Sequence, residues 1–135
     1  CTGCNDLFCA PRVRKYCTKK CQTDYIYGLK TKKNQYRYDC KFNFNLSDFP
    51  HKFDFALIEK YGWYSATNRG NNINGVSRDH MISLDYGWKN NIPAEIIAHP
   101  ANCQLLRHQD NFGKRTTCSI PIDELYTKIK NWNNH

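Results

Sequence analysis

Residues 77–115 read SRDHMISLDYGWKNNIPAEIIAHPANCQLLRHQDNFGKR, and most of the interpretable chemistry of the chain lies in them. The sequence predicts a strand over 76–84 and a second strand over 102–106. Between them a proline predicts a short helix over 93–98, and a further helix is expected after Asn111. The stretch therefore predicts strand, loop, strand and helix in an α+β fold, with polar side chains where these elements meet.

Four polar residues stand at these junctions: Asp79, His80, Asn102 and Asn111. Neighbours on a strand point to opposite faces, so the side chains of Asp79 and His80 face apart unless a bend intervenes. A carboxylate and an amide oxygen, as at Asp79 and Asn111, are hard ligands that suit Mg²⁺. A neutral imidazole can deprotonate a water near pH 7. The set therefore predicts a hydrolytic metal site.

Each of these residues also has a simpler interpretation when it is taken alone. His80 could be a hydrogen-bonded core histidine, and Asp79 could cap a turn. The chain is rich in Asn, so Asn102 and Asn111 could match a pattern by chance. Their joint spacing favours the metal site. His108 is an alternative metal ligand, but it is one residue out of register with the face that would carry Asn111.

This pattern resembles the HNH endonucleases, which are also called ββα-metal or His-Me finger nucleases, in the form found in phages and prophages. The resemblance covers about residues 76–115 closely. It is carried by Asp79-His80, Asn102, Gln104-Leu105-Leu106, Asn111 and Gly113-Lys114-Arg115. Many such nucleases hold a second cysteine pair beside the site, whereas this chain has Arg107 and Asp110 there. The resemblance therefore implies a ββα-metal core that is held by packing rather than by a zinc of its own.

The resemblance also implies a role for each matching residue. His80 would be the general base that activates a water, and Asp79 and Asn111 would hold one catalytic Mg²⁺ or Mn²⁺ ion. Asn102 would hold the loop that carries His80. Phosphate contacts are expected from three basic residues: Arg78, Lys114 and Arg115. The implied reaction is hydrolysis of DNA phosphodiester bonds, which leaves 5′-phosphate and 3′-hydroxyl ends.

One such site cuts one strand, so a double-strand break implies a homodimer or two binding events. The alternative function is a non-catalytic zinc-knuckle DNA-binding module whose ββα element is a relic. Asp79, His80 and Asn111 argue against it, because a DNA-binding module has no need for all three. Metal dependence separates the two functions, since cleavage needs Mg²⁺ or Mn²⁺ and charge-driven binding does not.

The chain has eight cysteines, which fit either a disulfide framework or a metal site. Cys1 and Cys4 form a C-x2-C pair, and Cys17 and Cys21 form a C-x3-C pair after twelve intervening residues. Two such pairs place four thiolates around one tetrahedral zinc, and a disulfide within C-x2-C would be strained. The pattern favours a structural Zn²⁺ knuckle without an open coordination position. The other four are expected to be small buried side chains: Cys9, Cys40, Cys103 and Cys118.

Positive charge is concentrated at the start of the chain. Residues 1–41 hold ten Lys and Arg against three acids, a net charge of +7, whereas 42–135 hold ten against nine. This excess favours DNA as the partner over a membrane surface, since no basic amphipathic helix supports the latter. The loop between the cysteine pairs is either a solvated loop or a phosphate contact through Arg12, Arg14 and Lys15.

The chain is also expected to act inside the cell and away from the membrane. No run approaches the ~20 apolar residues of a membrane span. A zinc site made of four cysteines indicates a reducing compartment, here the cytoplasm of a bacterium or of a phage host. Three regions are predicted: a zinc knuckle over 1–24, a connecting and DNA-recognition region over 25–75, and the catalytic domain over 76–135. The remaining predicted elements are a helix over 22–33, a strand over 36–44, a helix over 53–61 and a helix over 123–132.

Overall fold

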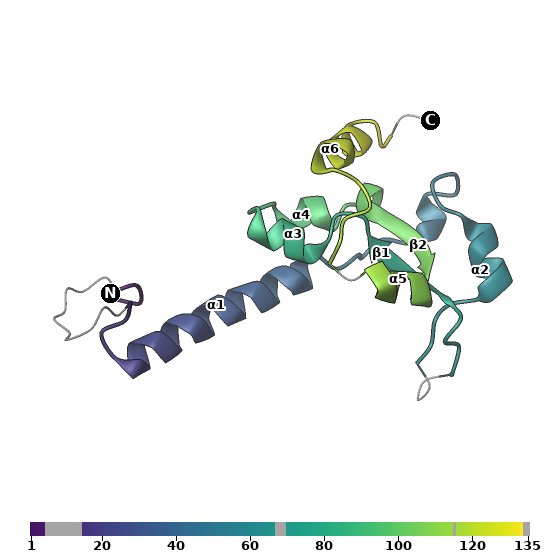
Figure 1. Ribbon diagram of the computed structural model, residues 1–135. Helices are drawn as coiled ribbons and strands as arrows, with labels where there is room; N and C mark the ends of the chain where they lie inside the picture. Colours follow the sequence, from purple (N-terminus) through teal and green to yellow (C-terminus); the bar gives the residue numbers. More distant parts are fainter. Residues whose placement is uncertain (5–14, 67–69, 115, 134–135) are drawn as a thin grey trace. The chain divides into compact units, whose positions relative to one another are not determined.

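The computed structural model describes residues 1–4, 15–66, 70–114 and 116–133 (Figure 1). The chain divides into two compact units, Cys1–Tyr38 and Asp39–His135. Residues 25–38 therefore belong with the cysteine pairs, and residues 39–75 belong with the strands. Within the described residues, no helix has both the length and the apolar character that crossing a membrane requires.

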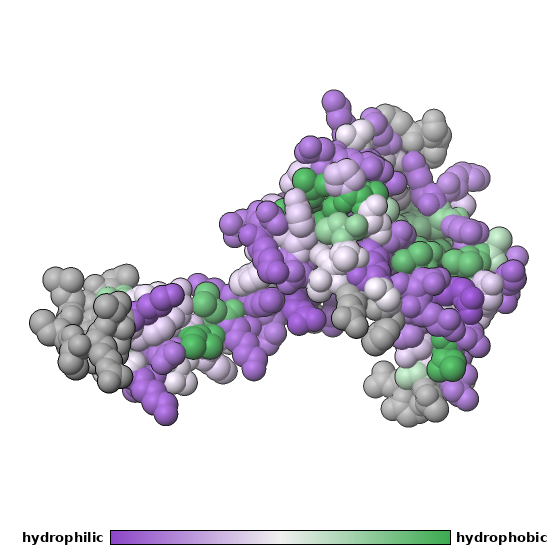
Figure 2. All heavy atoms as spheres, in the orientation of Figure 1, coloured by the Kyte–Doolittle hydropathy of each residue, from purple (hydrophilic) through white to green (hydrophobic). Residues whose placement is uncertain are grey.

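Helix α1 (Lys19–Asp39) dominates the first unit. It begins behind Thr18, whose hydroxyl accepts a hydrogen bond of 3.0 Å from the backbone N–H of Cys21 and so caps the helix. None of its residues is buried, and its surface in Figure 2 is largely hydrophilic. Its exposed apolar side chains include Ile26 and Leu29, which are 50% and 43% exposed. The helix is therefore held by its own backbone hydrogen bonds and its cap rather than by a core.

The strand predicted over 36–44 is wrong, because α1 continues through Asp39. Its alternation of aromatic and polar residues is typical of a strand only where one face is buried, and Tyr38 stays 66% exposed. Beyond the helix the alternation does describe the packing. Cys40 is buried and Phe42 is half-buried, whereas Lys41 between them is exposed, although the backbone forms no ladder there.

The second unit is a mixed α+β unit with a small two-stranded antiparallel sheet. Strand β1 (Val76–His80) pairs with β2 (Cys103–Arg107), with His80 opposite Cys103. Strand β1 is shorter than predicted because helix α3 (Leu84–Lys89), which the sequence pattern missed, begins soon after it. The side chain of Ser83 caps α3 by accepting from the N–H of Tyr86 at 3.1 Å.

Short helices fill the connection between the strands, and a longer one follows them. The connection also carries α4 (Ala94–Ile97), as predicted, and the 3₁₀ turn η2 (Pro100–Asn102). Helix α5 (His108–Lys114) begins directly after β2 and packs on both strands (Figure 1). It begins earlier than predicted, so Asn111 lies inside the helix rather than before it.

Two further helices and an aromatic cluster complete this unit. Helices α2 (Phe55–Tyr61) and α6 (Ile122–Lys130) match the predicted helices over 53–61 and 123–132, and the 3₁₀ turn η1 (Leu46–Asp48) precedes α2. The rings of Phe44, Phe49, Phe53 and Trp132 pack edge to face or stacked. The buried apolar residues are Cys40, Leu46, Val76, Ile82, Ile92, Ile97, Ala101, Cys103 and Leu125. This core holds the ends of β1 and β2 in place.

Candidate functional site

The two faces of β1 carry different chemistry. Ser77 and Asp79 point toward α5, where the amide of Asn111 donates to the hydroxyl of Ser77 at 3.2 Å. The ammonium of Lys114 lies 3.1 Å from the Asp79 carboxylate. Asn111 and Lys114 are three residues apart, so they share one face of the helix. His80 points to the opposite face, as expected for a neighbour of Asp79 on a strand.

Asp79 is a buried carboxylate, with 8% of its surface exposed. Its Oδ2 atom accepts a hydrogen bond of 2.7 Å from the amide of Gln104, the residue opposite it on β2. The same oxygen forms the ion pair with Lys114, whose ammonium also donates to the backbone carbonyl of His80 at 2.6 Å. The ammonium of Lys114 therefore balances the negative charge of Asp79, and the amide of Gln104 orients its carboxylate. Neither partner was expected from the sequence, because Gln104 and Lys114 meet Asp79 through strand register and helix packing.

His80 is held on the other face by the segment that follows α1. Its Nε2 atom lies 2.8 Å from the backbone oxygen of Cys40, and its ring stacks on Phe42 with centroids 4.0 Å apart. A carbonyl only accepts, so Nε2 carries the proton and Nδ1 keeps the lone pair. Burial lowers the pKa of His80 below 6.5, as does the nearby Lys114 charge, against the opposing effects of the Cys40 carbonyl and Asp79. The imidazole is therefore neutral at pH 7, the state that a general base requires.

Asn102 is fully buried at the end of the connection between the strands. Its amide oxygen accepts from the N–H of Ile82 at 2.7 Å, and its amide nitrogen donates to the carbonyls of Ile82 and Ile97 at 3.1 and 2.9 Å. The backbone carbonyl of Asn102 accepts from the backbone N–H of Met81 at 2.8 Å. One side chain thus fixes the backbone immediately after His80.

The side chains of the other residues that the sequence predicted as phosphate contacts or metal ligands do not contact Asp79 or His80 where the structure describes them. Arg78 donates to the carbonyl of Phe44 at 2.8 Å and lies over its ring, so it fastens the 40–44 segment to β1. His108 stacks on Tyr64, with ring centroids 3.5 Å apart, and its Nδ1 atom is buried without a hydrogen-bond partner among the described residues. Arg115 lies outside the described residues, as do Arg12 and Arg14, and Lys15 is exposed.

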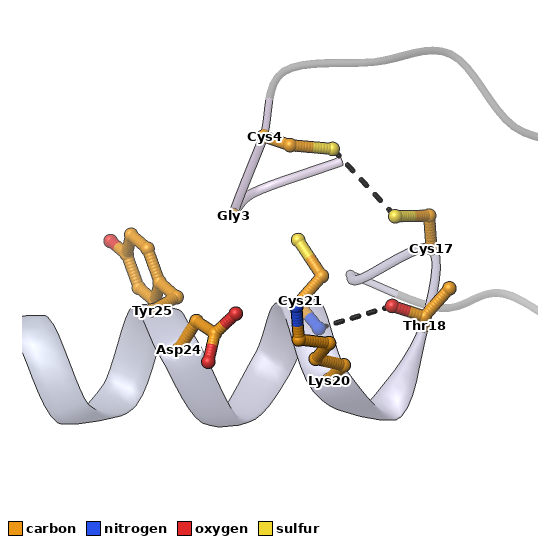
Figure 3. A pocket seen from close by; sticks show the side chains of 8 residues that line it. All are labelled: Gly3, Cys4, Cys17, Thr18, Lys20, Cys21, Asp24 and Tyr25. Carbon is orange, nitrogen blue, oxygen red and sulfur yellow. Dashed lines mark hydrogen bonds between the residues drawn. The ribbon is translucent and has the colours of Figure 1, made fainter.

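The second cluster is formed by four cysteines of the first unit, and Figure 3 shows three of them. The sulfur atoms of Cys1, Cys4, Cys17 and Cys21 all lie within 4.8 Å of one another. Cys1 and Cys21 are 3.5 Å apart, and Cys4 and Cys17 are 3.6 Å apart. A disulfide would bring two sulfurs to about 2.0 Å, whereas metal–sulfur bonds of about 2.3 Å in a tetrahedron separate them by about 3.8 Å. The four thiols lie close enough to bind one metal ion.

The backbone around this cluster lies close to the sulfur atoms and donates a hydrogen bond to one of them. The N–H of Cys17 donates to the sulfur of Cys1 at 3.3 Å. A Cβ atom on Gly3 would lie 2.5 Å from the sulfur of Cys21, so a side chain there would displace that thiol. Desolvation and the neighbouring thiols of Cys4 and Cys17 raise the pKa of Cys21 to about 11. A bound cation would offset this, since metal binding and thiol deprotonation are coupled.

The isolated cysteines largely follow the prediction. Cys40 and Cys103 are buried, and burial raises the pKa of Cys103 to about 12, which makes its thiol unreactive. Cys118 is partly exposed and accepts from the backbone N–H of Ser83 at 3.4 Å. Cys9 lies outside the described residues.

Comparisons of the chain with protein-family models, with curated proteins and with solved structures find no match.

Proposed function

We propose that this protein is a metal-dependent DNA endonuclease of the HNH, or ββα-metal, type. The observation that carries the proposal is the environment of His80 at the end of β1. The imidazole is held by the Cys40 carbonyl through Nε2, its pKa is lowered by burial, and it adjoins the acidic Asp79. A neutral histidine held in one orientation is what a general base needs, and Asp79 precedes it in the chain on the other face of β1.

In this proposal His80 takes a proton from the attacking water at Nδ1 while Nε2 stays bonded to the Cys40 carbonyl. Asn102 is a positioning residue, because its hydrogen bonds fix the backbone of Met81 and Ile82 directly after the base. The water oxygen then bonds to phosphorus as the bond from phosphorus to the 3′ oxygen breaks, and the 3′ oxygen takes up a proton from solvent, which leaves a 5′-phosphate and a 3′-hydroxyl.

Asp79 and Asn111 are the residues that would hold Mg²⁺ or Mn²⁺ on the α5 face of β1. When bound, the ion would neutralise charge on the phosphate and on the leaving oxygen. The donors fit such an ion in type, since carboxylate, amide and carbonyl oxygens are its preferred ligands. The ammonium of Lys114 already occupies a cation position between the Asp79 carboxylate and the carbonyl of His80.

The four-cysteine cluster is proposed to bind a structural Zn²⁺ ion. Four thiolates leave no coordination position for water, so the ion would stabilise the first unit rather than take part in cleavage. Its test is Gly3→Ala, which crowds the sulfur of Cys21 and should weaken zinc binding. Gly28→Ala is the matched control, because a Cβ there meets nothing within 4 Å. Equal zinc affinity in the two variants, measured by competition with a chromogenic chelator, would argue against this site.

The proposed partner is DNA, and the basic first unit is proposed to supply part of the contact. Helix α1 carries six Lys and Arg against two Asp, and none of its residues is buried. Lys15 is exposed next to the cysteine cluster. A duplex held by such groups should dissociate steeply as salt is raised, because each phosphate contact releases counterions.

The test is nicking of supercoiled plasmid by the zinc-loaded protein, with and without added Mg²⁺. Wild type should nick DNA only with Mg²⁺ or Mn²⁺, and His80→Ala should lower the rate by at least about 100-fold, as expected for loss of a general base. His51→Ala is the matched control, since His51 is exposed and outside the site. A His80→Ala protein that nicks DNA at the wild-type rate would contradict the assignment of His80 as the base.

The alternative is a DNA-binding module that does not cut, and the Asp79–Lys114 ion pair is the observation that favours it. A carboxylate whose charge is already balanced by an ammonium needs no metal ion to balance it. Under this alternative the wild type binds DNA in a salt-dependent way and never nicks it in Mg²⁺ or Mn²⁺.

A further inference from the structure

The ammonium of Lys114 lies between two oxygen atoms, one of which belongs to Asp79, a proposed metal ligand. Its ammonium is 3.1 Å from Oδ2 of Asp79 and 2.6 Å from the backbone oxygen of His80. Both partners are oxygen atoms, and both are acceptors that hard cations also use. The side chains of Lys114 and Asp79 are only 11% and 10% exposed, so the pair is largely shielded from solvent.

The ammonium is well placed for exchange with another cation. Lys114 reaches Asp79 from α5, on the helix face that also carries Asn111, the second proposed metal ligand. Its charge is at the end of a flexible four-carbon chain, so it can leave without movement of the helix. An ammonium and a divalent ion cannot share Asp79 closely, because like charges a few ångströms apart repel strongly in a partly buried site.

We propose that Lys114 is a built-in competitor for the catalytic metal: its ammonium holds Asp79 in the metal-free protein and must leave when Mg²⁺ or Mn²⁺ binds. The inference rests on the proposed function in that it takes Asp79 as the metal ligand. This competition explains the Asp79–Lys114 ion pair in a protein that still binds a catalytic metal. Lys114 is then a positioning residue for Asp79, and it sets how much free metal the protein needs.

The direct measurement is the affinity of the zinc-loaded full chain for Mn²⁺, followed by electron paramagnetic resonance of the free ion. Lys114→Met removes the charge and keeps the aliphatic stem, so it should bind Mn²⁺ about tenfold or more tightly than wild type, as one nearby charge implies. A residue that merely supported the fold would weaken binding when replaced. Asp79→Asn should abolish the tight site in both backgrounds.

The matched control is Lys89→Met. Lys89 also pairs with an aspartate, Asp85 at 2.9 Å, but this pair is exposed and on α3. Its removal should leave the Mn²⁺ affinity unchanged. Lys114→Gln is the second variant, because its neutral amide can still donate to Asp79 and thus protects the fold. Native tryptophan emission checks that each variant is folded.

The outcomes separate this inference from the proposed function. Wild-type Mn²⁺ affinity in both Lys114 variants would overturn the inference, even if the enzyme cuts DNA. The inference is also overturned if neither the wild type nor any Lys114 variant shows Mn²⁺ binding that is lost with Asp79→Asn. Tighter Mn²⁺ binding in the Lys114 variants supports the inference whether or not DNA is cut. If DNA is then never cut with metal bound, the nuclease proposal fails and the metal competition stands.

Discussion

Asn102 combines complete burial with three side-chain hydrogen bonds to backbone groups of the connection between β1 and β2. Buried polar groups are costly when they lose a partner, and replacing Asn102 would strand a donor and two acceptors at once. A single amide therefore closes the connection that follows His80, and its loss would act on both stability and geometry.

We expect Asn102→Ala to lower the free energy of unfolding by about 3 kcal/mol, since each stranded group costs about 1–3 kcal/mol and some will find water. Asn90→Ala is the control, because Asn90 is exposed and donates a single bond to Tyr86. It should cost about 0.5 kcal/mol. Urea unfolding followed by tryptophan fluorescence measures both, and equal costs would contradict the role given to Asn102.

The lowered pKa of His80 predicts a pH dependence of stability. Burial lowers the pKa of His80, and burial alone also lowers that of His99. The unfolded chain takes up these protons near pH 6.5, whereas the folded protein resists them to a lower pH. The unfolded state then binds more protons, so the free energy of unfolding should fall as the pH drops below about 6.5.

The measurement is urea unfolding at a series of pH values between 8 and 5. His80→Gln should flatten the fall, because the imidazole that resists protonation is gone. His51→Gln should leave it unchanged, since His51 is exposed. A wild-type stability that stays constant or rises over this range would contradict the prediction.

At the scale of elements, the two faces of β1 determine the candidate site. One face meets α5 and carries Asp79, and the other meets the 40–44 segment and carries His80. The proposed base and the proposed metal ligand are thus adjacent in sequence but are held by different parts of the second unit. The site depends on where β1 begins and how closely it approaches the preceding chain.

Gly75 controls that approach. A Cβ at this position would overlap the backbone of Trp63 and Tyr64, atoms that cannot move aside as a flexible side chain would. We expect Gly75→Ala to lower the free energy of unfolding by about 2–3 kcal/mol, as overpacking typically does. Gly113→Ala is the matched control, because a Cβ there meets nothing within 4 Å and alanine favours a helix by up to about 1 kcal/mol.

Thermal or urea unfolding of the two variants makes the comparison. Gly75→Ala should unfold earlier than wild type, and Gly113→Ala should unfold at the same point or slightly later. A Gly75→Ala protein as stable as wild type would show that the backbone near Trp63 yields easily, and β1 would then not be fixed by this contact.

At the scale of the whole molecule, the two units have different sources of stability. The second unit has a buried core, whereas helix α1 buries none of its residues. A helix without a core needs local support, and the cysteine cluster at its start is the support available. Metal binding to such a cluster contributes directly to the free energy of folding.

Removal of the metal should therefore unfold the first unit and spare the second. All three tryptophans lie within Asp39–His135, so their emission reports the second unit alone. We expect a chelator to reduce the helical circular dichroism signal, because α1 frays, and to leave the urea midpoint of tryptophan fluorescence unchanged. Cys4→Ser should mimic the chelator, and Cys118→Ser should not. A tryptophan midpoint that falls with metal removal would contradict the independence of the units.

The sequence by itself determined the features that depend on short spacing. The two cysteine pairs predicted the cluster, because residues three and four apart are forced close together. Helical spacing of apolar residues predicted α2 and α6, both strands were placed approximately, and the mixed α+β class followed from these elements. The opposite orientations of Asp79 and His80 also followed, since alternation along a strand is a local property.

Only the tertiary structure decided the rest, since those features depend on contacts between residues far apart in the chain. Cys40 and Phe42 meet His80 across about 40 residues, and the contact with the Cys40 carbonyl fixes which ring nitrogen carries the proton. Lys114 meets Asp79 across 35 positions, so no local pattern in the sequence indicates this ion pair. Helix α1 replaced a predicted strand because alternation is meaningful only where a face is buried, and burial is a property of the folded chain.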